Sequence, residues 1–333
     1  MTTPPVSIIM PCYNSVETLP AALDAIIALD YPVFELIVVD DCSTDSSYSI
    51  VQQYAEKYPF IYLFKLEHNS GVQAARDFTT RKARYEWIAS TDSDAEVAPD
   101  WLKKACRHFA AADMIGGRFL AKPESLLERG LDALSAGKEM KLRRYMPHTV
   151  RLDPYGGGAN LFYRKAVFTA LGGYDPEVRA GEDILFIANG LEKGFVYCFD
   201  PDLVVVHPFS PRCSSITEFL CRFWQLHKWR KVAGKKSRLI RNRNYLIAAG
   251  GMAVYVTWGL AILLAGIVSG TLLFLMIVAA LLTVQALRVT IRTGEQLPLC
   301  LLGALLKLVR RVVGGMAILL PGSPTPAGWS KRS

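Results

Sequence analysis

Residues 35–45, Glu-Leu-Ile-Val-Val-Asp-Asp-Cys-Ser-Thr-Asp, carry a continuous apolar run that leads directly into a cluster of carboxylates. The apolar half is typical of a strand buried on both faces of a parallel sheet. Asp40, Asp41 and Asp45 then fall at the carboxyl edge of that sheet, where ligands bind in open α/β folds. One of the paired carboxylates can accept an N–H group of a nucleobase, while Ser43 and Asp45 can cap the following helix.

Strands and helices are expected to alternate around this stretch. Short apolar runs predict three further strands, at residues 6–10, 61–66 and 87–90. Apolar residues at helical spacing predict three helices, at residues 15–29, 46–57 and 71–83. The alternation predicts an α/β fold with a doubly wound sheet.

The second half of this region is harder to assign from its pattern. Helical spacing predicts three more helices, at residues 101–112, 161–171 and 184–193. Residues 113–155 are mixed in charge and are expected to be irregular, and strands are expected at 195–199 and 203–206.

A second acidic cluster, Asp92-Ser93-Asp94, follows the strand expected at 87–90. Acids gathered at one sheet edge repel one another unless a cation is present, which suggests Mg²⁺ or Mn²⁺ carrying a phosphate-bearing substrate. His207 follows an expected strand and can complete the metal shell through a neutral ring nitrogen, or it can be an ordinary core or surface histidine. Arg212 can pair with a diphosphate.

Glu182-Asp183 precedes an apolar helix start. A carboxylate at that position can simply stabilise the helix N-terminus. The functional alternative is a general base that accepts the proton of a hydroxyl nucleophile. The sequence contains no Walker A loop, no Gly-x-Gly-x-x-Gly fingerprint, no Gly-x-Ser-x-Gly elbow and no His-Glu-x-x-His pair.

The apolar residues, 51% of the 333, are concentrated in residues 245–320. Two runs there, 245–268 and 271–287, predict membrane spans joined as a hairpin, and 297–320 predicts an interfacial amphipathic helix or a third span. The net charge of +8 is concentrated beside them, in a basic juxtamembrane segment at 221–244. Because basic residues mark the cytoplasmic flank and attract anionic lipids, this charge favours membrane lipids over nucleic acid as the partner.

Seven scattered cysteines with no Cys-x-x-Cys pair fit reduced thiols in a cytosolic domain. No cleaved signal peptide is expected at the N-terminus. The expected location is therefore the inner membrane, with the catalytic part in the cytoplasm and a tail at 321–333.

The chain resembles the inverting glycosyltransferases of family 2, of the membrane-anchored bacterial type. The resemblance extends over roughly residues 6–210 and is carried by six stretches in the family's order, at 6–14, 35–45, 69–77, 90–94, 157–164 and 181–184. It implies the GT-A fold, a Rossmann-like doubly wound sheet, over a domain at residues 1–220. It also implies a nucleotide-diphosphate sugar as donor, a divalent metal (Mn²⁺ or Mg²⁺) as cofactor, and transfer to a lipid-linked or saccharide acceptor of the cell envelope.

The resemblance also implies residue roles. Tyr13 would stack on the nucleobase and Asp41 would bind its polar edge. Asp92 would lie on the ribose or diphosphate side, Asp94 would ligate the metal, and Asp183 would deprotonate the acceptor hydroxyl. Two further donor-binding residues are expected in the matched stretches, at Pro11 and Arg76. The acceptor side is expected to include the matched residues Gly157, Gly158, Asn160 and Glu182.

Gln225-Leu-His-Lys228-Trp229 resembles the Gln-x-x-Arg-Trp signature of membrane polysaccharide synthases and is expected to contribute to the acceptor side. Lys228 replaces the arginine, and lysine lacks its planar donor fork. Together with the small number of spans, this departure favours addition of one or a few sugars. A processive polysaccharide synthase and a catalytically inactive membrane scaffold are the alternatives.

Overall fold

A computed structural model describes most of the amino-terminal two thirds of the chain. The described residues are 3–123, 129, 141–147, 149, 157–208, 221, 225, 228, 229, 231–241, 282 and 283. The predicted spans at 245–268, 271–287 and 297–320 and the tail at 321–333 lie outside them, apart from residues 282 and 283. Within the described residues, no helix is both long and apolar enough to span a bilayer.

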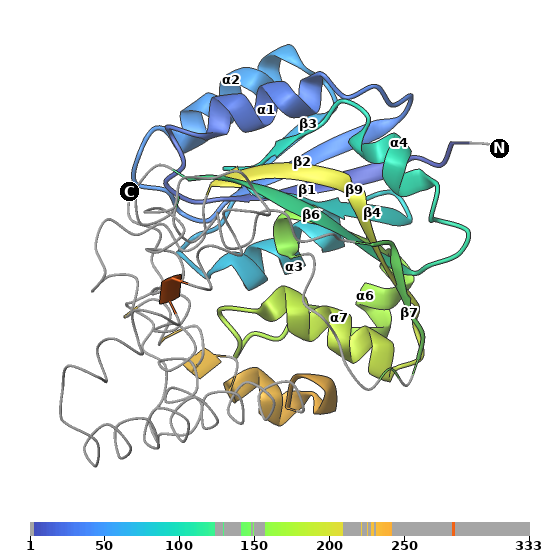
Figure 1. Cartoon of the computed structure of the whole chain (residues 1–333). Coiled ribbons are helices and arrows are strands. Elements are labelled where there is room, and N and C mark those ends of the chain that lie inside the picture. Colours follow the sequence, from blue (N-terminus) through green and yellow to red (C-terminus); the bar gives the residue numbers. More distant parts are fainter. Residues whose placement is uncertain are drawn as a thin grey trace.

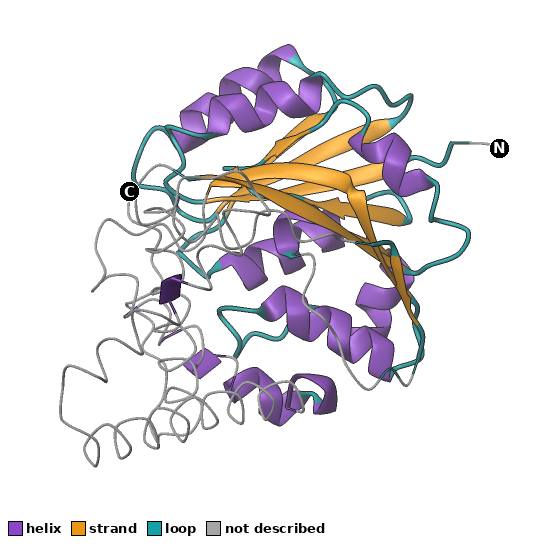
Figure 2. Cartoon of the chain, in the orientation of Figure 1, coloured by secondary structure: helices purple, strands orange, loops and turns teal. Residues whose placement is uncertain are grey.

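In the described part of the chain, nine strands form one mixed sheet, and helices cover both of its faces (Figures 1 and 2). The strands are β1 Val6–Cys12, β2 Phe34–Asp40, β3 Ile61–Lys65, β4 Trp87–Ser90, β5 Glu96–Val97, β6 Met114–Lys122, β7 Arg143–Tyr145, β8 Leu161–Arg164 and β9 Tyr197–Pro208. The helices are α1 Leu19–Ile27, α2 Ser47–Lys57, α3 Val72–Lys82, α4 Trp101–Cys106, α6 Lys165–Leu171 and α7 Glu182–Glu192, with a 3-10 turn, η1, at Gly158–Asn160.

The strand order is β3-β2-β1-β4-β8-β6-β9-β5, and β7 pairs with β9. The first four strands are parallel and in the order 3-2-1-4, which confirms the predicted doubly wound α/β sheet for this half. In Figure 1, α1, α2 and α4 cover one face, and α3, α6 and α7 cover the other.

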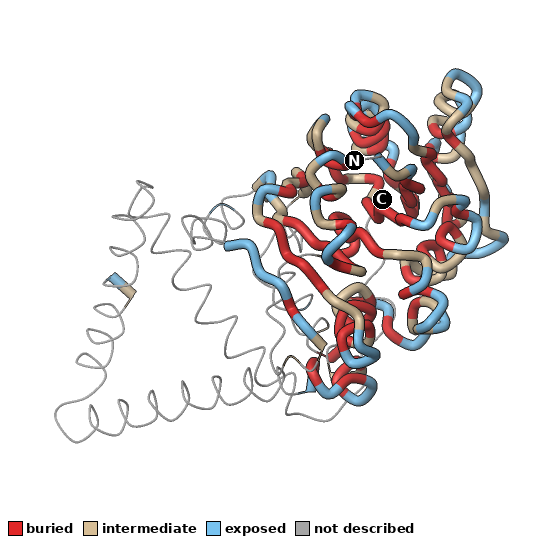
Figure 3. The backbone as a smooth tube through the Cα atoms, turned by 90° about the vertical axis from the view of Figure 1, so that its right-hand side faces the viewer, coloured by how far each residue is buried: buried red, intermediate tan, exposed pale blue. Residues whose placement is uncertain are grey.

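Two hydrophobic cores flank the sheet, because successive side chains of a strand point to opposite faces. In β1, Ile8 and Met10 enter the core under α1, α2 and α4. Ile9, between them, enters the core on the side of α6 and α7. The tube in Figure 3 is accordingly buried through the middle of the domain and exposed at its outer helices and loops. The central strands are therefore covered on both faces, as their continuous apolar runs predict.

Two predictions for the middle of the chain are wrong. Residues 161–171 are not one helix, since Leu161–Arg164 is strand β8, antiparallel to both β4 and β6, and the helix begins only at Lys165. The apolar run in β8 is only three residues, 161–163, which is too short to show which period it follows. Residues 113–155 are not wholly irregular either, because Met114–Lys122 forms β6.

The strands predicted at 195–199 and 203–206 are a single strand, β9, interrupted by an irregularity in its pairing with β6. Gly117 pairs with Asp200 and the next residue, Arg118, pairs with Val204, so the residues between are bulged out. Beyond this bulge β9 continues to His207 and Pro208. The bulge thus lets β9 keep pairing until it delivers His207 to the sheet edge.

Part of the basic segment predicted at 221–244 packs on the domain. Residues 231–236 and 238–241 are helical and lie beside α7 (Figure 1). The Glu192 carboxylate accepts hydrogen bonds from the Ser237 hydroxyl at 2.9 Å and from the Leu239 backbone N–H at 3.0 Å. Lys236 pairs with Asp175 at 2.8 Å. This segment is consequently an extension of the folded domain, with its apolar side buried.

Candidate active site

Two carboxylates and one imidazole converge after β4 and at the end of β9. One ligand atom from each of Asp92, Asp94 and His207 lies within 4.8 Å of the other two. The His207 Nε2 atom is 3.2 Å from Asp94 Oδ1 and 3.9 Å from Asp92 Oδ2. Carboxylate oxygens and a neutral imidazole suit Mn²⁺, and carboxylates suit Mg²⁺. The donor set therefore fits the divalent metal expected from the sequence.

Ser93 explains why the two flanking aspartates face the same way. Its side chain is fully buried, and its hydroxyl bonds to the Ser15 hydroxyl at 2.7 Å. The Thr18 hydroxyl donates to the Ser93 carbonyl at 3.1 Å. Ser93 and Asp94 lie in a turn in which the Ala95 N–H donates to the Asp92 carbonyl at 3.1 Å, and with Ser93 anchored in the interior both flanking aspartates stay half-buried. The sequence shows Ser93 only as the spacer of the motif, so this anchoring role was missed.

His207 is oriented as metal ligands commonly are. Its Nδ1 atom lies 2.7 Å from the Pro208 carbonyl, which can only accept, so Nδ1 carries the hydrogen. Nε2 is then left facing the aspartates as a potential ligand. Burial lowers the pKa of His207, but the hydrogen bonds and charges of Asp92 and Asp94 outweigh it and raise the pKa to about 10. The two carboxylates thus strongly favour a positive charge at this position.

Arg76 joins this cluster to the second acidic motif. On α3, its Nη2 atom is 2.6 Å from Asp92 Oδ1 and its Nη1 atom pairs with Glu182 Oε1. Only 3% of the Arg76 side chain is exposed. Burial lowers its pKa, and the carboxylates of Asp92 and Glu182 more than offset this and raise it. Arg76 is therefore a permanent buried cation between the two acidic motifs.

Glu182 and Asp183 form the first turn of α7 and have different surroundings. Glu182 is buried, and burial followed by the neighbouring Asp183 charge raises its pKa to about 7, against the opposing effect of Arg76. Asp183 is only half-buried. Its Oδ2 atom accepts the Gly158 N–H at 2.6 Å, and Oδ1 accepts the Ile184 N–H at 2.7 Å. Of the two carboxylates, Asp183 is the one that is partly open to solvent.

The glycine pair at 157–158 lies against both motifs. A Cβ atom on Gly158 would come within 2.3 Å of the Arg76 guanidinium, and one on Gly157 within 2.9 Å of Asp183 Oδ2. Only glycine lets the main chain approach this closely. The structure thus brings together Gly157, Gly158, Glu182 and Asp183, and their contact with an acceptor stays a prediction.

Asp41 lies at the carboxyl end of β2, and both of its oxygens accept backbone N–H groups. The donors are Ser70 at 2.7 Å and Gly71 at 2.8 Å. Burial raises the pKa of Asp41, and these two bonds act in the opposite direction. Asp41 therefore also fixes the loop before α3, besides its predicted contact with a nucleobase. Pro11 is buried in β1 and Tyr13 is half-buried just after it, at the same sheet edge.

Asn160 is not an acceptor-facing side chain, because all of its amide groups bond to protein. Its Nδ2 group donates to the carbonyls of Arg118 at 3.1 Å and Leu203 at 2.9 Å. Its Oδ1 atom accepts the Trp101 Nε1–H at 2.9 Å. The residue is fully buried and joins α4 to strands β6 and β9. Its role is to hold the site's scaffold together.

We expect Asn160→Leu to lower the free energy of unfolding by about 3 kcal/mol, because it strands a buried donor and two buried carbonyls that each cost about 1–3 kcal/mol unless they relax. Urea denaturation followed by tryptophan fluorescence measures the loss. The matched control is Gln53→Leu on the exposed side of α2, with an expected change within about 0.5 kcal/mol. An equal effect at both positions contradicts the assigned role.

The remaining predicted residues lie farther along the chain. Lys228 and Trp229 are buried and Gln225 is half-buried, and Arg212 lies outside the described residues. For Lys228, burial followed by the charge of Lys231 lowers the pKa. The acceptor-side roles of Gln225, Lys228 and Trp229 remain predictions.

Phe119 is a site residue that sequence reasoning missed. Its ring lies edge-on to His207, with 5.7 Å between the ring centres, and a Cβ on Gly157 would be 3.3 Å from it. It thus borders both the metal cluster and the loop that holds Asp183. Its place in strand β6 could have identified it. That strand was not predicted, because residues 113–155 were interpreted as irregular.

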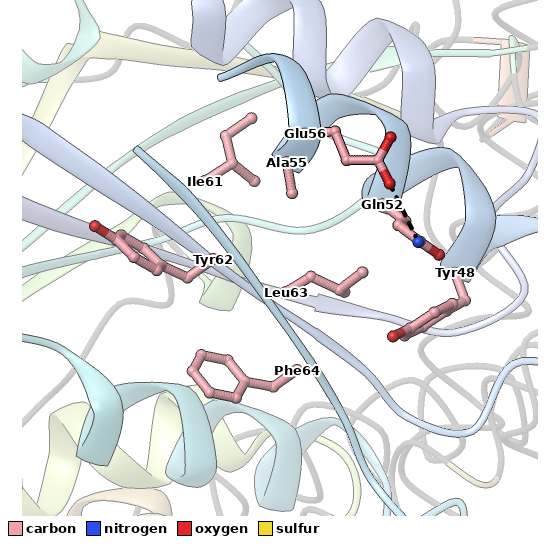
Figure 4. A pocket seen from close by; sticks show the side chains of 8 residues that line it. All are labelled: Tyr48, Gln52, Ala55, Glu56, Ile61, Tyr62, Leu63 and Phe64. Carbon is pink, nitrogen blue, oxygen red and sulfur yellow. Dashed lines mark hydrogen bonds between the residues drawn. The ribbon is translucent and has the colours of Figure 1, made fainter. Parts of the chain in front are cut away.

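A shallow groove of about 430 Å³ lies at the opposite end of the sheet, between α2 and the edge strand β3 (Figure 4). Its lining includes Tyr48, Gln52 and Glu56, with a 3.2 Å hydrogen bond from Gln52 to Glu56. None of the acidic residues of the two motifs lines it. The groove is therefore separate from the site described above.

A doubly wound sheet with an Asp-x-Asp turn, a histidine and a carboxylate pair at its edge defines the class of nucleotide-sugar-dependent transferases. Residues 7–172 match the model of glycosyl transferase family 2. The chain belongs to this family.

Individual relatives agree with this assignment. The chain is 28% identical over 202 residues to the succinoglycan biosynthesis protein ExoO of Rhizobium meliloti, covering 57% of each protein. It is 25% identical to glycosyltransferase AglE of Haloferax volcanii, covering 63% of this chain and 69% of AglE. Since matches to the first relatives cover 57% and 40% of them, the chain spans about half their length.

A solved structure shares the fold. The mannosyltransferase PcManGT of Pyrobaculum calidifontis, in complex with GDP-Man and Mn²⁺, superposes with a TM-score of 0.64 at 21% identity. The superposition covers 92% of this chain and 88% of that one. This confirms the GT-A-like α/β architecture expected from the sequence.

Proposed function

We propose that this chain is a membrane-associated, metal-dependent, inverting glycosyltransferase. It transfers one or a few sugars from a nucleoside-diphosphate donor to a hydroxyl group of a lipid-linked or saccharide acceptor. The observation that carries the proposal is the bridging of the Asp92–Asp94–His207 cluster to the Glu182–Asp183 turn by Arg76. A site for the leaving diphosphate and a base for the nucleophile then stand side by side.

Different residues of the chain act on the nucleophile and on the leaving group. Asp183, held by the Gly158 N–H, accepts the proton as the acceptor oxygen attacks the anomeric carbon. The bond from that carbon to the diphosphate oxygen breaks as the new bond forms on the opposite face, so the anomeric configuration inverts. A divalent ion bound by Asp92, Asp94 and His207 would supply charge stabilisation to the departing diphosphate.

The acceptor and membrane assignments rest on other features. ExoO, by its name, belongs to succinoglycan biosynthesis, and this favours a saccharide of the cell envelope as the acceptor class. The apolar stretch at 245–320 supports a membrane anchor. Beside it, Lys235, Arg238 and Arg241 are exposed on the helical segment docked to α7, a placement suited to the anionic cytoplasmic surface.

A thermal-shift screen tests the proposal. The full chain in detergent is scanned against UDP- and GDP-sugars, each with Mn²⁺ and with EDTA. The true donor should raise the melting temperature most, and by more with Mn²⁺ than with EDTA, because a ligand at 100 times its Kd stabilises the native state by about 2.7 kcal/mol. Transfer is then measured with that donor, and product length separates addition of single sugars from processive synthesis. Equal shifts with and without Mn²⁺ contradict the proposed metal dependence.

A further inference from the structure

We infer that Arg76 is a positioning residue that holds the Asp-x-Asp turn and the Asp183-bearing turn in register, and that it does not bind the donor as the sequence suggests. The inference rests on the proposed function. It gives the buried Arg76 guanidinium a role both at the Asp-x-Asp turn and at the turn that carries Asp183. Its evidence is the geometry of the guanidinium, the loop that covers it and the charge around it.

The guanidinium has no surface left for a diphosphate. Nη2 is directed to Asp92 at 2.6 Å, Nη1 to Glu182, and the side chain is 3% exposed. The main chain at Gly158 lies directly against the Arg76 guanidinium, since a Cβ on Gly158 would approach Cζ and both terminal nitrogens within 2.3–2.5 Å. A donor phosphate could reach Arg76 only by displacing this loop.

The covering loop is the one that orients the base. Gly158 packs on Arg76 and at the same time donates its N–H to Asp183 Oδ2 at 2.6 Å. Arg76 therefore supports Asp183 twice, through the loop above it and through Glu182, the preceding residue on α7. Movement of the guanidinium would shift the proton acceptor relative to Asp92.

The charge at this place requires an arginine. Without it, Glu182, Asp183 and Asp92 would be neighbouring carboxylates in a largely buried site, and their repulsion would separate α7 from the Asp-x-Asp turn. Two carboxylates from different elements need two donors at fixed spacing, which a guanidinium fork provides and an ammonium group does not. Charge alone is thus insufficient at position 76.

The test uses two variants that affect different arms of this bridge. Arg76→Lys keeps the charge and removes the fork. Glu182→Gln keeps the shape of the arm to α7 and an acceptor oxygen, but it removes the negative charge and so weakens only that arm. The matched control is Arg81→Lys, also on α3 but with 60% of its side chain exposed. Three quantities are measured on the full chain: Mn²⁺ affinity without nucleotide, by electron paramagnetic resonance of free Mn²⁺; binding of UDP and GDP in EDTA, by calorimetry; and kcat with the donor identified above.

Arg76→Lys should weaken Mn²⁺ binding and lower kcat, each by about 10–100-fold, the range typical of residues that support metal ligands. Glu182→Gln should lower kcat at least tenfold and leave Mn²⁺ affinity within twofold, because Asp92 keeps its partner. Neither variant should change metal-free nucleotide binding by more than twofold, and Arg81→Lys should match the wild type in all three measurements.

Direct donor binding by Arg76 predicts the reverse pattern, and that pattern overturns the inference. Arg76→Lys would then weaken UDP or GDP binding in EDTA while leaving Mn²⁺ affinity unchanged, and Glu182→Gln would be silent. If Arg76→Lys does not fold, Glu182→Gln is a sufficient test by itself. A kcat equal to that of the wild type in Glu182→Gln also overturns the inference. Failure of the proposed function is recognised separately, because the wild-type chain itself would then bind no Mn²⁺.

Discussion

Replacing Asp183 with asparagine is expected to lower kcat by about 10²–10⁴-fold, the usual contribution of a positioned general base. Asparagine keeps an oxygen that can accept the Gly158 N–H, so the loop and the melting temperature should be preserved. Donor affinity, measured by the thermal shift with Mn²⁺, should also remain within about twofold of the wild type, since Asp183 acts on the acceptor.

The control for this experiment is Asp202→Asn, which removes an exposed carboxylate from β9 and should leave kcat unchanged. Retention of wild-type turnover in Asp183→Asn would show that another group accepts the proton. Glu182 would then be the next carboxylate to examine, although it is buried and paired with Arg76.

The second large effect is expected at the metal cluster. Asp94→Asn removes one charged ligand and should weaken Mn²⁺ binding by about 100-fold or more, because loss of a supporting partner alone commonly costs 10–100-fold. Transfer should fall in parallel and recover partly at high Mn²⁺ concentration. The measurement is activity against Mn²⁺ concentration, together with paramagnetic resonance of the free ion. Asp100→Asn, which alters a half-exposed carboxylate beside α4, is the control. Transfer by Asp94→Asn at the wild-type Mn²⁺ requirement would remove Asp94 from the metal shell.

The sequence predicted the first four strands of the sheet and the helices between them well. Phe34–Asp40 is buried along almost its whole length, and a continuous apolar run bounded by polar residues has few other interpretations. Strands β6 and β8 were missed for a physical reason. Each is placed by pairing with residues distant in the chain, as Leu161 pairs with both Ser90 and Gly116. Such pairing leaves no local periodicity to recognise.

The sequence indicated several of the residues that meet at the candidate site, but it did not show which of them bond to one another. Asp94 and His207 were expected as metal ligands, and the structure brings them together with Asp92, which was expected on the ribose or diphosphate side. Asn160 and Arg76 were assigned to ligands, whereas their side chains bond to protein. A motif shows that a polar residue is needed at a position, but the same residue type serves for a ligand contact and for a buried bridge. Only burial and partner distances separate the two.

Strand β9 is synthesised after the other described strands of the sheet, and this has a consequence for how the domain folds. The first four strands are built from consecutive βα units and can assemble while the rest of the chain is still being synthesised. Asp92 and Asp94 are present by then, but His207 joins them only when β9 has paired along β6, past its bulge, to its final residues. A nascent domain therefore holds two of the three ligand side chains until its last strand is in register. Tight retention of manganese would mark a finished molecule.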